Sequence, residues 1–190
     1  MRGKAMIPWC AALAALLAVI LFVNLPGAEP PEGADPGARP GQTEPDRPAG
    51  AAVGEKLPDF SVACLDGTRF TLSEHAGKTV VVNLWATWCA PCVRELAYFD
   101  RLQRENPDDV SVLALHSELV TQDVEEYLAG RDYSALAFAV APDESLTALL
   151  NGSTVLPQTI VIAPDGTVTY NKTGSLTYEA LTALVAEAAG

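Results

Sequence analysis

The chain has 190 residues, a formal net charge of −12 and 49% hydrophobic residues. Between Gly54 and Gly190 there are 19 acidic and 8 basic residues, a net charge of −11. This balance argues against nucleic-acid binding, which needs a basic face, and fits a soluble extracytoplasmic surface. The length allows one globular domain plus additional segments.

The N-terminus is typical of a segment that enters a membrane. Arg2 and Lys4 precede a run of 19 uncharged residues, Ala5–Val23. Such a run can just span a bilayer, and the positive-inside rule keeps the two basic residues in the cytoplasm. We expect residues 1–23 to be an uncleaved signal-anchor, because the run exceeds a usual signal-peptide core and no A-x-A site follows. Cleavage, which would release the protein, is the alternative.

Residues 24–53 are rich in Pro, Gly, Ala and acidic residues and offer almost nothing large to bury. This composition predicts a flexible linker, with the folded domain spanning residues 54–190. Cys10 lies within the apolar run, and no small residues precede it as a lipid-attachment signal requires. We interpret Cys10 as part of the membrane segment.

Strands and helices alternate along the predicted domain. Segments 60–64 and 68–72 flank Asp66-Gly67 and predict a β-hairpin. The nearly continuous apolar run 79–86 predicts a central strand, and a helix runs from about Pro91 to before Pro107. The other predicted elements are a strand at 110–115, a helix at 121–129, a strand at 135–140, a short helix at 144–150, a hairpin of 159–163 with 167–170, and a helix at 178–189. This order predicts the α/β class, with a sheet flanked by helices.

The most informative motif is Trp88-Cys89-Ala90-Pro91-Cys92. The predicted central strand leads into the motif, and Leu96, Phe99 and Leu102 follow it at helical spacing. The C-x-x-C pair therefore starts a helix after a buried strand. Unpaired N–H groups and the positive dipole end of such a helix favour a thiolate over a thiol. In this setting a C-x-x-C is a redox motif.

Three other interpretations of Cys89 and Cys92 are weaker. A structural disulfide closing so small a loop would constrain the chain little. A zinc site needs a second C-x-x-C or paired histidines. Haem attachment requires a histidine directly after the second cysteine, where this chain has Val93.

The chain resembles the TlpA/ResA-like membrane-tethered thiol–disulfide oxidoreductases of the thioredoxin superfamily. Three blocks carry the resemblance: Gly54–Phe60, Val82–Glu95, and Val155–Ile162 followed by Asp165-Gly166. The middle block is the most specific. The resemblance implies a thioredoxin-like fold, in which a central mixed β-sheet is flanked by helices. It also implies an N-terminal β-hairpin and an inserted helix and strand, all preceded here by a single transmembrane helix.

Matching positions imply roles in thiol–disulfide exchange. Cys89 would be the exposed nucleophile, and Cys92, more buried, would resolve the mixed disulfide. Pro157 would be a cis-proline that turns the backbone of Leu156 toward a client, which could pair along it like an added strand. Trp88 would shield the sulfurs and offer an apolar contact surface.

Glu95 matches a glutamate that ResA-like members carry one turn past the second cysteine, where it would tune thiol pKa and assist proton transfer. The alternative is a solvated helix carboxylate. Asn83 stands where cytosolic thioredoxins have a buried aspartate, so Glu95 becomes the candidate proton acceptor. Ala97 replaces a proline that kinks the helix in many relatives, which puts that kink in doubt.

The remaining polar candidates have simpler interpretations. Cys64 is expected to be a small buried residue of the hairpin. His75 and His116 are not linked by any spacing, so we expect structural or solvated histidines. The charged positions of the 121–129 helix, Asp123, Glu125 and Glu126, predict a solvated face.

Together these features predict an extracytoplasmic enzyme that exchanges its Cys89/Cys92 dithiol with client disulfides and needs no metal or organic cofactor. We expect the enzyme to act as a reductant, although reductant and oxidant members share this architecture. The resemblance implies a membrane electron donor of the CcdA/DsbD type and oxidised apocytochrome c as one client. A peroxiredoxin-like thiol peroxidase is an alternative, although Thr87 lies two residues before Cys89 rather than three. A non-enzymatic module that binds a soft metal such as Cu(I) through the cysteines is another.

Overall fold

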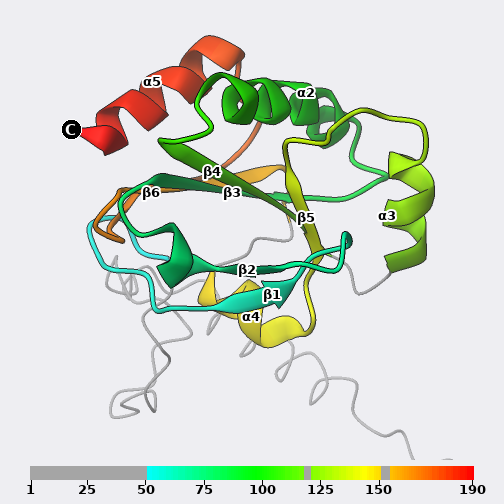
Figure 1. The fold of residues 1–190 in the computed structure, drawn as a ribbon, viewed down its shortest axis with the longest axis horizontal. Coiled ribbons are helices and arrows are strands. Elements are labelled where there is room, and N and C mark those ends of the chain that lie inside the picture. The colour runs from blue at the N-terminus through cyan, green and yellow to red at the C-terminus, as the bar shows by residue number, and fades with distance from the viewer. Residues whose placement is uncertain (1–50, 118–120, 151–154) are drawn as a thin grey trace, which may run out of the picture. The chain divides into compact units, whose positions relative to one another are not determined.

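The computed structural model describes residues 51–117, 121–150 and 155–190. A five-stranded mixed sheet in the order β5-β4-β3-β6-β7 forms its centre (Figure 1). Its strands are β3 (Thr79–Trp85), β4 (Val110–His116), β5 (Ala137–Val140), β6 (Gln158–Ile162) and β7 (Val168–Thr173). The first three run parallel, whereas β6 and β7 are antiparallel to their neighbours.

Two layers cover the sheet (Figure 1). One face carries α2 (Ala90–Glu105) and α5 (Tyr178–Ala189). The other carries the antiparallel hairpin of β1 (Ser61–Ala63) and β2 (Arg69–Thr71), the 3₁₀ helix η1 (Leu72–His75) and α4 (Glu144–Leu149). The helix α3 (Thr121–Leu128) lies beyond β5, at the side of the sheet. Each face therefore buries its own apolar cluster, as a two-sided α/β sheet requires.

The central strands follow directly from their composition. Every residue of β3 and of β4 is buried, because both strands lie inside the sheet and both faces are covered. The register pairs Trp85 with His116 across β3 and β4, and Leu84 with Gln158 across β3 and β6. The end of β3, the end of β4 and the start of β6 thus meet at one edge of the sheet.

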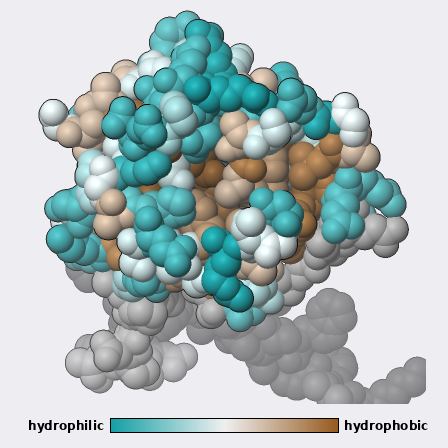
Figure 2. Space-filling view, in the orientation of Figure 1, coloured by the Kyte–Doolittle hydropathy of each residue, from teal (hydrophilic) through white to brown (hydrophobic). Residues whose placement is uncertain are grey.

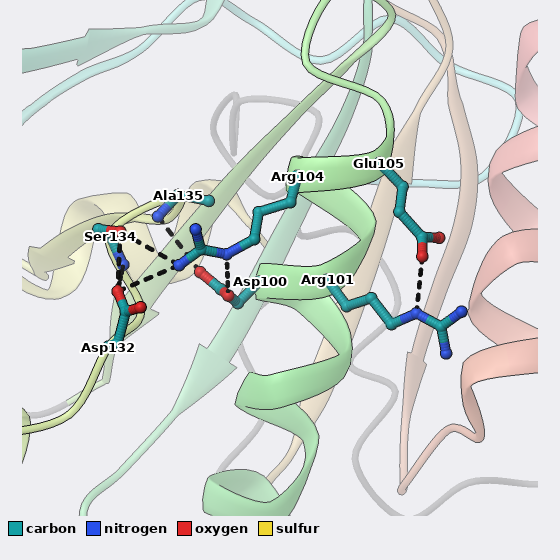
Figure 3. Close-up of polar contacts among 7 residues, drawn as sticks. All are labelled: Asp100, Arg101, Arg104, Glu105, Asp132, Ser134 and Ala135. Atoms are coloured by element: carbon teal, nitrogen blue, oxygen red, sulfur yellow. Dashed lines mark hydrogen bonds and ion pairs between the residues drawn. The ribbon is translucent and has the colours of Figure 1, made fainter.

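Helix α2 is held on the sheet by its apolar stripe and by polar contacts on both flanks (Figure 3). Leu96, Phe99 and Leu102 are buried in the core. On one flank, the mostly buried carboxylate of Asp100 accepts hydrogen bonds from Arg104 Nε at 2.7 Å and from the backbone N–H of Ala135 at 3.2 Å. Arg104 continues to the segment before β5, where it contacts Asp132 Oδ1 and Ser134 Oγ, each at 3.1 Å.

On the opposite flank, Arg101 Nε donates to Glu105 Oε1 at 2.8 Å (Figure 3). The other oxygen of Glu105 accepts from the hydroxyl of Tyr178 at the start of α5. The guanidinium of Arg101 also lies over the Tyr178 ring, 4.1 Å from its centre. These contacts tie α2 to α5, so the position of the motif at the start of α2 is set by two neighbouring elements.

The predicted elements and the α/β class are confirmed, with boundaries shifted by a few residues. The main differences are η1, which the sequence pattern did not predict, and β7, which extends to Thr173 rather than 170. Ala51 is already buried and its N–H donates to Leu149 O at 2.9 Å, so ordered packing includes a residue three positions before the predicted domain start. The predicted segment 1–23 and most of the predicted linker lie outside the described residues. Among the helices of the described residues, none is long and apolar enough to cross a membrane.

Candidate active site

Cys89 and Cys92 are joined by a disulfide at the N-terminus of α2, with sulfurs 1.99 Å apart and Cα atoms 5.2 Å apart. Cys89 is the N-cap of the helix, and its sulfur accepts from the N–H of Cys92 at 3.4 Å. Pro91 lies in the first helical turn, where its missing N–H costs nothing. No acidic residue occupies this turn, so the helix N-terminus can stabilise a thiolate at Cys89 after reduction.

The two sulfur-bearing residues differ in burial. Cys89 is 5% exposed and Cys92 is fully buried. The prediction of an exposed Cys89 is therefore wrong for the oxidised protein, because Cys89 is bonded to Cys92 and packs in the apolar cluster beneath α2. The predicted asymmetry is confirmed, since Cys89 is the more accessible of the pair.

A proline loop lies at the same edge of the sheet. The Leu156–Pro157 peptide bond is cis, as predicted, and Pro157 is buried directly before β6. Leu156 is partly buried and packs against the cluster that contains both cysteines. Val155, the residue before it, is 61% exposed. The register of Leu84 with Gln158 brings this loop beside the chain that leaves β3 toward Cys89.

Trp88 projects from the turn before Cys89 and is 63% exposed. Tryptophan is highly buried on average, so a side chain this exposed is unusual. Trp88 and Val155 are two of the four large hydrophobic residues exposed in the described part of the chain.

Glu95 lies one turn past Cys92 and is only 3% exposed, so it is not a solvated carboxylate. One carboxyl oxygen accepts from the backbone N–H of Leu176, in the loop between β7 and α5. The other oxygen is buried without a hydrogen-bond partner in the described structure. Burial raises the pKa of Glu95, an effect that hydrogen bonds from Leu176 and Ser175 partly oppose. The same loop is tied to the proline, because Gly174 N–H donates to Pro157 O at 2.8 Å.

Asn83 and Ala97 complete the predicted set. Asn83 is fully buried, and its Nδ2 donates to Gln158 O at 3.4 Å and to Thr159 Oγ1 at 3.5 Å. Helix α2 runs without interruption through Ala97.

One contact of the motif was not predicted from the sequence. His116 was expected to be structural or solvated, and the structure confirms a structural role: its buried imidazole accepts a hydrogen bond from the backbone N–H of Thr87 at 3.3 Å. The sequence signal for this contact was the position of His116 at the end of a strand, next to the strand that leads into the C-x-x-C. His75 instead stacks on Phe70, with ring centres 4.2 Å apart.

The surface has other features besides the redox motif. Figure 2 shows hydrophobic surface in a hollow surrounded by polar side chains. A groove between the hairpin turn, α3 and β5 is lined mainly by apolar residues: Leu65, Leu128, Tyr133, Leu136 and Phe138.

Across the described ranges, no group of three or more His, Cys, Asp or Glu residues could hold a metal ion. Cys64 is buried and free, as predicted, and burial raises the pKa of its thiol.

Comparison with known proteins agrees with this geometry. The Redoxin family model matches residues 52–186. The chain is 34% identical over 131 residues to "Thiol-disulfide oxidoreductase ResA" of Geobacillus thermodenitrificans, which covers 67% of this chain and 73% of the relative. It is 33% identical over 103 residues to "Thioredoxin-like protein YneN" of Bacillus subtilis, 54% of this chain and 61% of that protein; the chain thus spans less than two thirds of YneN.

Solved structures give the same result. The crystal structure of a putative thiol:disulfide interchange protein DsbE from Chlorobium tepidum matches with a TM-score of 0.66 and 25% identity, covering 73% of this chain and 99% of that one. The exposed lipoprotein thioredoxin Etrx1 from Streptococcus pneumoniae matches with a TM-score of 0.63 and 27% identity, covering 68% and 99%.

Proposed function

We propose, from the premise that this chain belongs to the Redoxin family and is a thiol–disulfide oxidoreductase of the thioredoxin superfamily, that it is a membrane-tethered reductant of extracytoplasmic client proteins. The observation that carries the proposal is the Cys89–Cys92 disulfide at the start of α2, at the same sheet edge as cis-Pro157. The apolar run 5–23 supports the tether, and the acidic surface supports an extracytoplasmic location.

The reaction begins with the reduced enzyme. The Cys89 thiolate attacks one sulfur of a client disulfide, and the other client sulfur leaves as a thiolate. Cys92, deprotonated, then attacks the Cys89 sulfur, breaks the mixed disulfide and releases the client as a dithiol. Two electrons pass to the client, and the enzyme ends with the Cys89–Cys92 disulfide seen in the structure. Cys89 is the attacking group because it is the more accessible sulfur and caps the helix.

In the proposed mechanism Glu95 accepts the proton from Cys92. It lies one turn further along α2, its carboxyl is buried with one oxygen unpaired, and burial raises its pKa above the ordinary value. Asn83 cannot serve, since an amide does not titrate.

Client proteins dock on the apolar surface around the motif. Trp88 and Val155 are both largely exposed, one before Cys89 and one before the proline loop. The backbone of Leu156 lies between Val155 and cis-Pro157 and can pair with an extended client segment. Re-reduction requires an electron donor in the membrane, and a protein of the CcdA/DsbD type fits a tethered enzyme. Oxidised apocytochrome c, expected from the family resemblance of the sequence, is one proposed client.

The direction of electron flow is tested by the equilibrium reduction potential of the Cys89/Cys92 pair against glutathione. A reductant requires a value close to that of thioredoxin, about −270 mV, whereas an oxidant such as DsbA has a value of about −120 mV. Wild-type protein should also reduce insulin disulfides, and Cys89→Ser should not. A potential near the DsbA value, or peroxide consumption without a partner protein, would contradict the proposal.

The tether and location are tested separately. Intact cells are treated with a membrane-impermeant protease, and the domain is followed with an antibody. Loss of the domain with retention of a membrane-bound N-terminal fragment is expected. A protected domain would contradict the extracytoplasmic location, and domain recovered only from the medium would contradict the uncleaved anchor.

A further inference from the structure

The turn that leads into the redox pair leaves one backbone N–H, that of Thr87, outside the hydrogen bond that closes the turn. Cys89 N–H donates to Ala86 O at 3.1 Å, which closes a β-turn with Thr87 and Trp88 at its centre. This turn aims Trp88 outward and places Cys89 at the N-cap of α2. The N–H of Thr87 takes no part in that closing hydrogen bond. A turn amide left without an acceptor beside a buried cluster would cost free energy.

His116 supplies the acceptor from the neighbouring strand. Its Nε2 accepts the Thr87 N–H at 3.3 Å. The side chain is fully buried, and its ring meets Trp85 edge-on with centres 5.3 Å apart. The backbone of His116 is also held, because its carbonyl accepts from Ala141 N–H at 3.0 Å.

We infer that His116 is a positioning residue for thiol–disulfide exchange: its imidazole fixes the Ala86–Cys89 turn and thereby the orientation of Trp88 and Cys89. An accepting Nε2 carries no proton, so His116 acts as a neutral ring protonated on Nδ1. A leucine or methionine could fill the same space but could not accept from Thr87. The inference depends on exchange at Cys89/Cys92 alone and not on the tether or on the direction of electron flow.

Two variants separate the hydrogen bond from the volume of the ring. His116→Gln keeps an acceptor that can reach Thr87 N–H, whereas His116→Met keeps an apolar side chain of similar length without a comparable acceptor. Three quantities are measured for each: the exchange rate of the Thr87 amide by NMR, kcat/KM for disulfide reduction with insulin, and the Cys89/Cys92 reduction potential. Thermal unfolding reports whether each variant is folded.

We expect His116→Met to accelerate Thr87 amide exchange and lower kcat/KM by about fivefold or more, the factor that corresponds to losing one hydrogen bond of about 1 kcal/mol. We expect His116→Gln to keep the Thr87 amide exchange rate and kcat/KM close to their wild-type values. If His116→Met does not fold, the imidazole ¹⁵N spectrum of the wild type decides, since an unprotonated Nε2 is required.

Three results would overturn the inference: an unchanged Thr87 exchange rate in folded His116→Met, an unchanged kcat/KM with faster exchange, or a His116→Gln variant as impaired as His116→Met. Failure of the proposed reductant role is distinguishable, because it would appear as a high potential in the wild type and leave the Thr87 exchange result unaffected.

Discussion

The buried carboxyl of Glu95, on the redox helix, accepts a hydrogen bond from the backbone N–H of Leu176, 81 positions later in the chain. The loop that supplies this N–H also donates from Gly174 to the carbonyl of cis-Pro157. One short loop thus connects the carboxyl one turn past Cys92 with the proline loop. The two predicted halves of the active site are joined through a segment that the sequence motifs do not contain.

Glu95 should make stability depend on pH. Burial raises its pKa above the ordinary value of 4.5, so between 4.5 and the raised pKa the folded protein holds a proton that the unfolded chain has lost. Stability therefore falls as pH rises through this interval. Glu95→Gln removes the ionisation. The free energy of unfolding of this variant minus that of wild type should therefore be larger at pH 7.5 than at pH 4.

Urea denaturation of the oxidised proteins at both pH values measures the difference. Glu187→Gln, the same change at an exposed position of α5, is the matched control. A Glu95→Gln difference that is the same at both pH values would show that the buried carboxyl does not titrate as argued.

Trp88 should contribute to client binding and little to stability. Trp88→Ala is expected to lower kcat/KM for a folded protein client by about tenfold, the loss typical of an exposed aromatic anchor at an interface, and to change the unfolding free energy by less than about 0.5 kcal/mol. The rate with a small disulfide such as oxidised glutathione should change much less. Val53→Ala, which alters another exposed apolar side chain, is the control; equal losses for both variants would refute a specific docking role.

Asp100 should contribute more to stability than the superficially similar carboxylate of Glu105. Asp100 is mostly buried and accepts from Arg104 and from Ala135 N–H, so Asp100→Ala leaves a backbone donor unpaired and should cost about 1–3 kcal/mol. Glu105 forms a solvent-exposed pair with Arg101, and Glu105→Ala should cost less than about 1 kcal/mol. Urea denaturation compares the two, and a larger loss for Glu105→Ala would contradict this order.

Much of the fold could be predicted because its elements carry clear local patterns. The apolar runs of β3 and β4 match strands buried on both faces, and Leu96, Phe99 and Leu102 match the buried stripe of α2. The end of β7 was underestimated because Asn171, Lys172 and Thr173 have no apolar alternation. They form an edge strand, and Asn171 Nδ2 donates to Ala51 O at 2.8 Å, a contact across 120 positions.

The site was predictable in its residues but not in its environment. The C-x-x-C and the proline loop are short motifs, so Cys89, Cys92 and Pro157 could be named from sequence. The hydrogen bond to Glu95 comes from the backbone of Leu176, and the hydrogen bond from Thr87 to His116 depends on strand order. Such contacts between distant segments leave no local pattern, and the small exposure of Cys89 likewise follows from tertiary packing.

The most direct measurement is intact-mass analysis of the reduced protein after brief exposure to a client disulfide. With Cys92→Ser, a covalent adduct should accumulate, and peptide mapping should place it on Cys89. With Cys89→Ser, no adduct should form at a comparable rate, because Cys92 is fully buried. An adduct on Cys92 in the Cys89→Ser protein as fast as that on Cys89, or no adduct on Cys89 at all, would contradict Cys89 as the attacking sulfur.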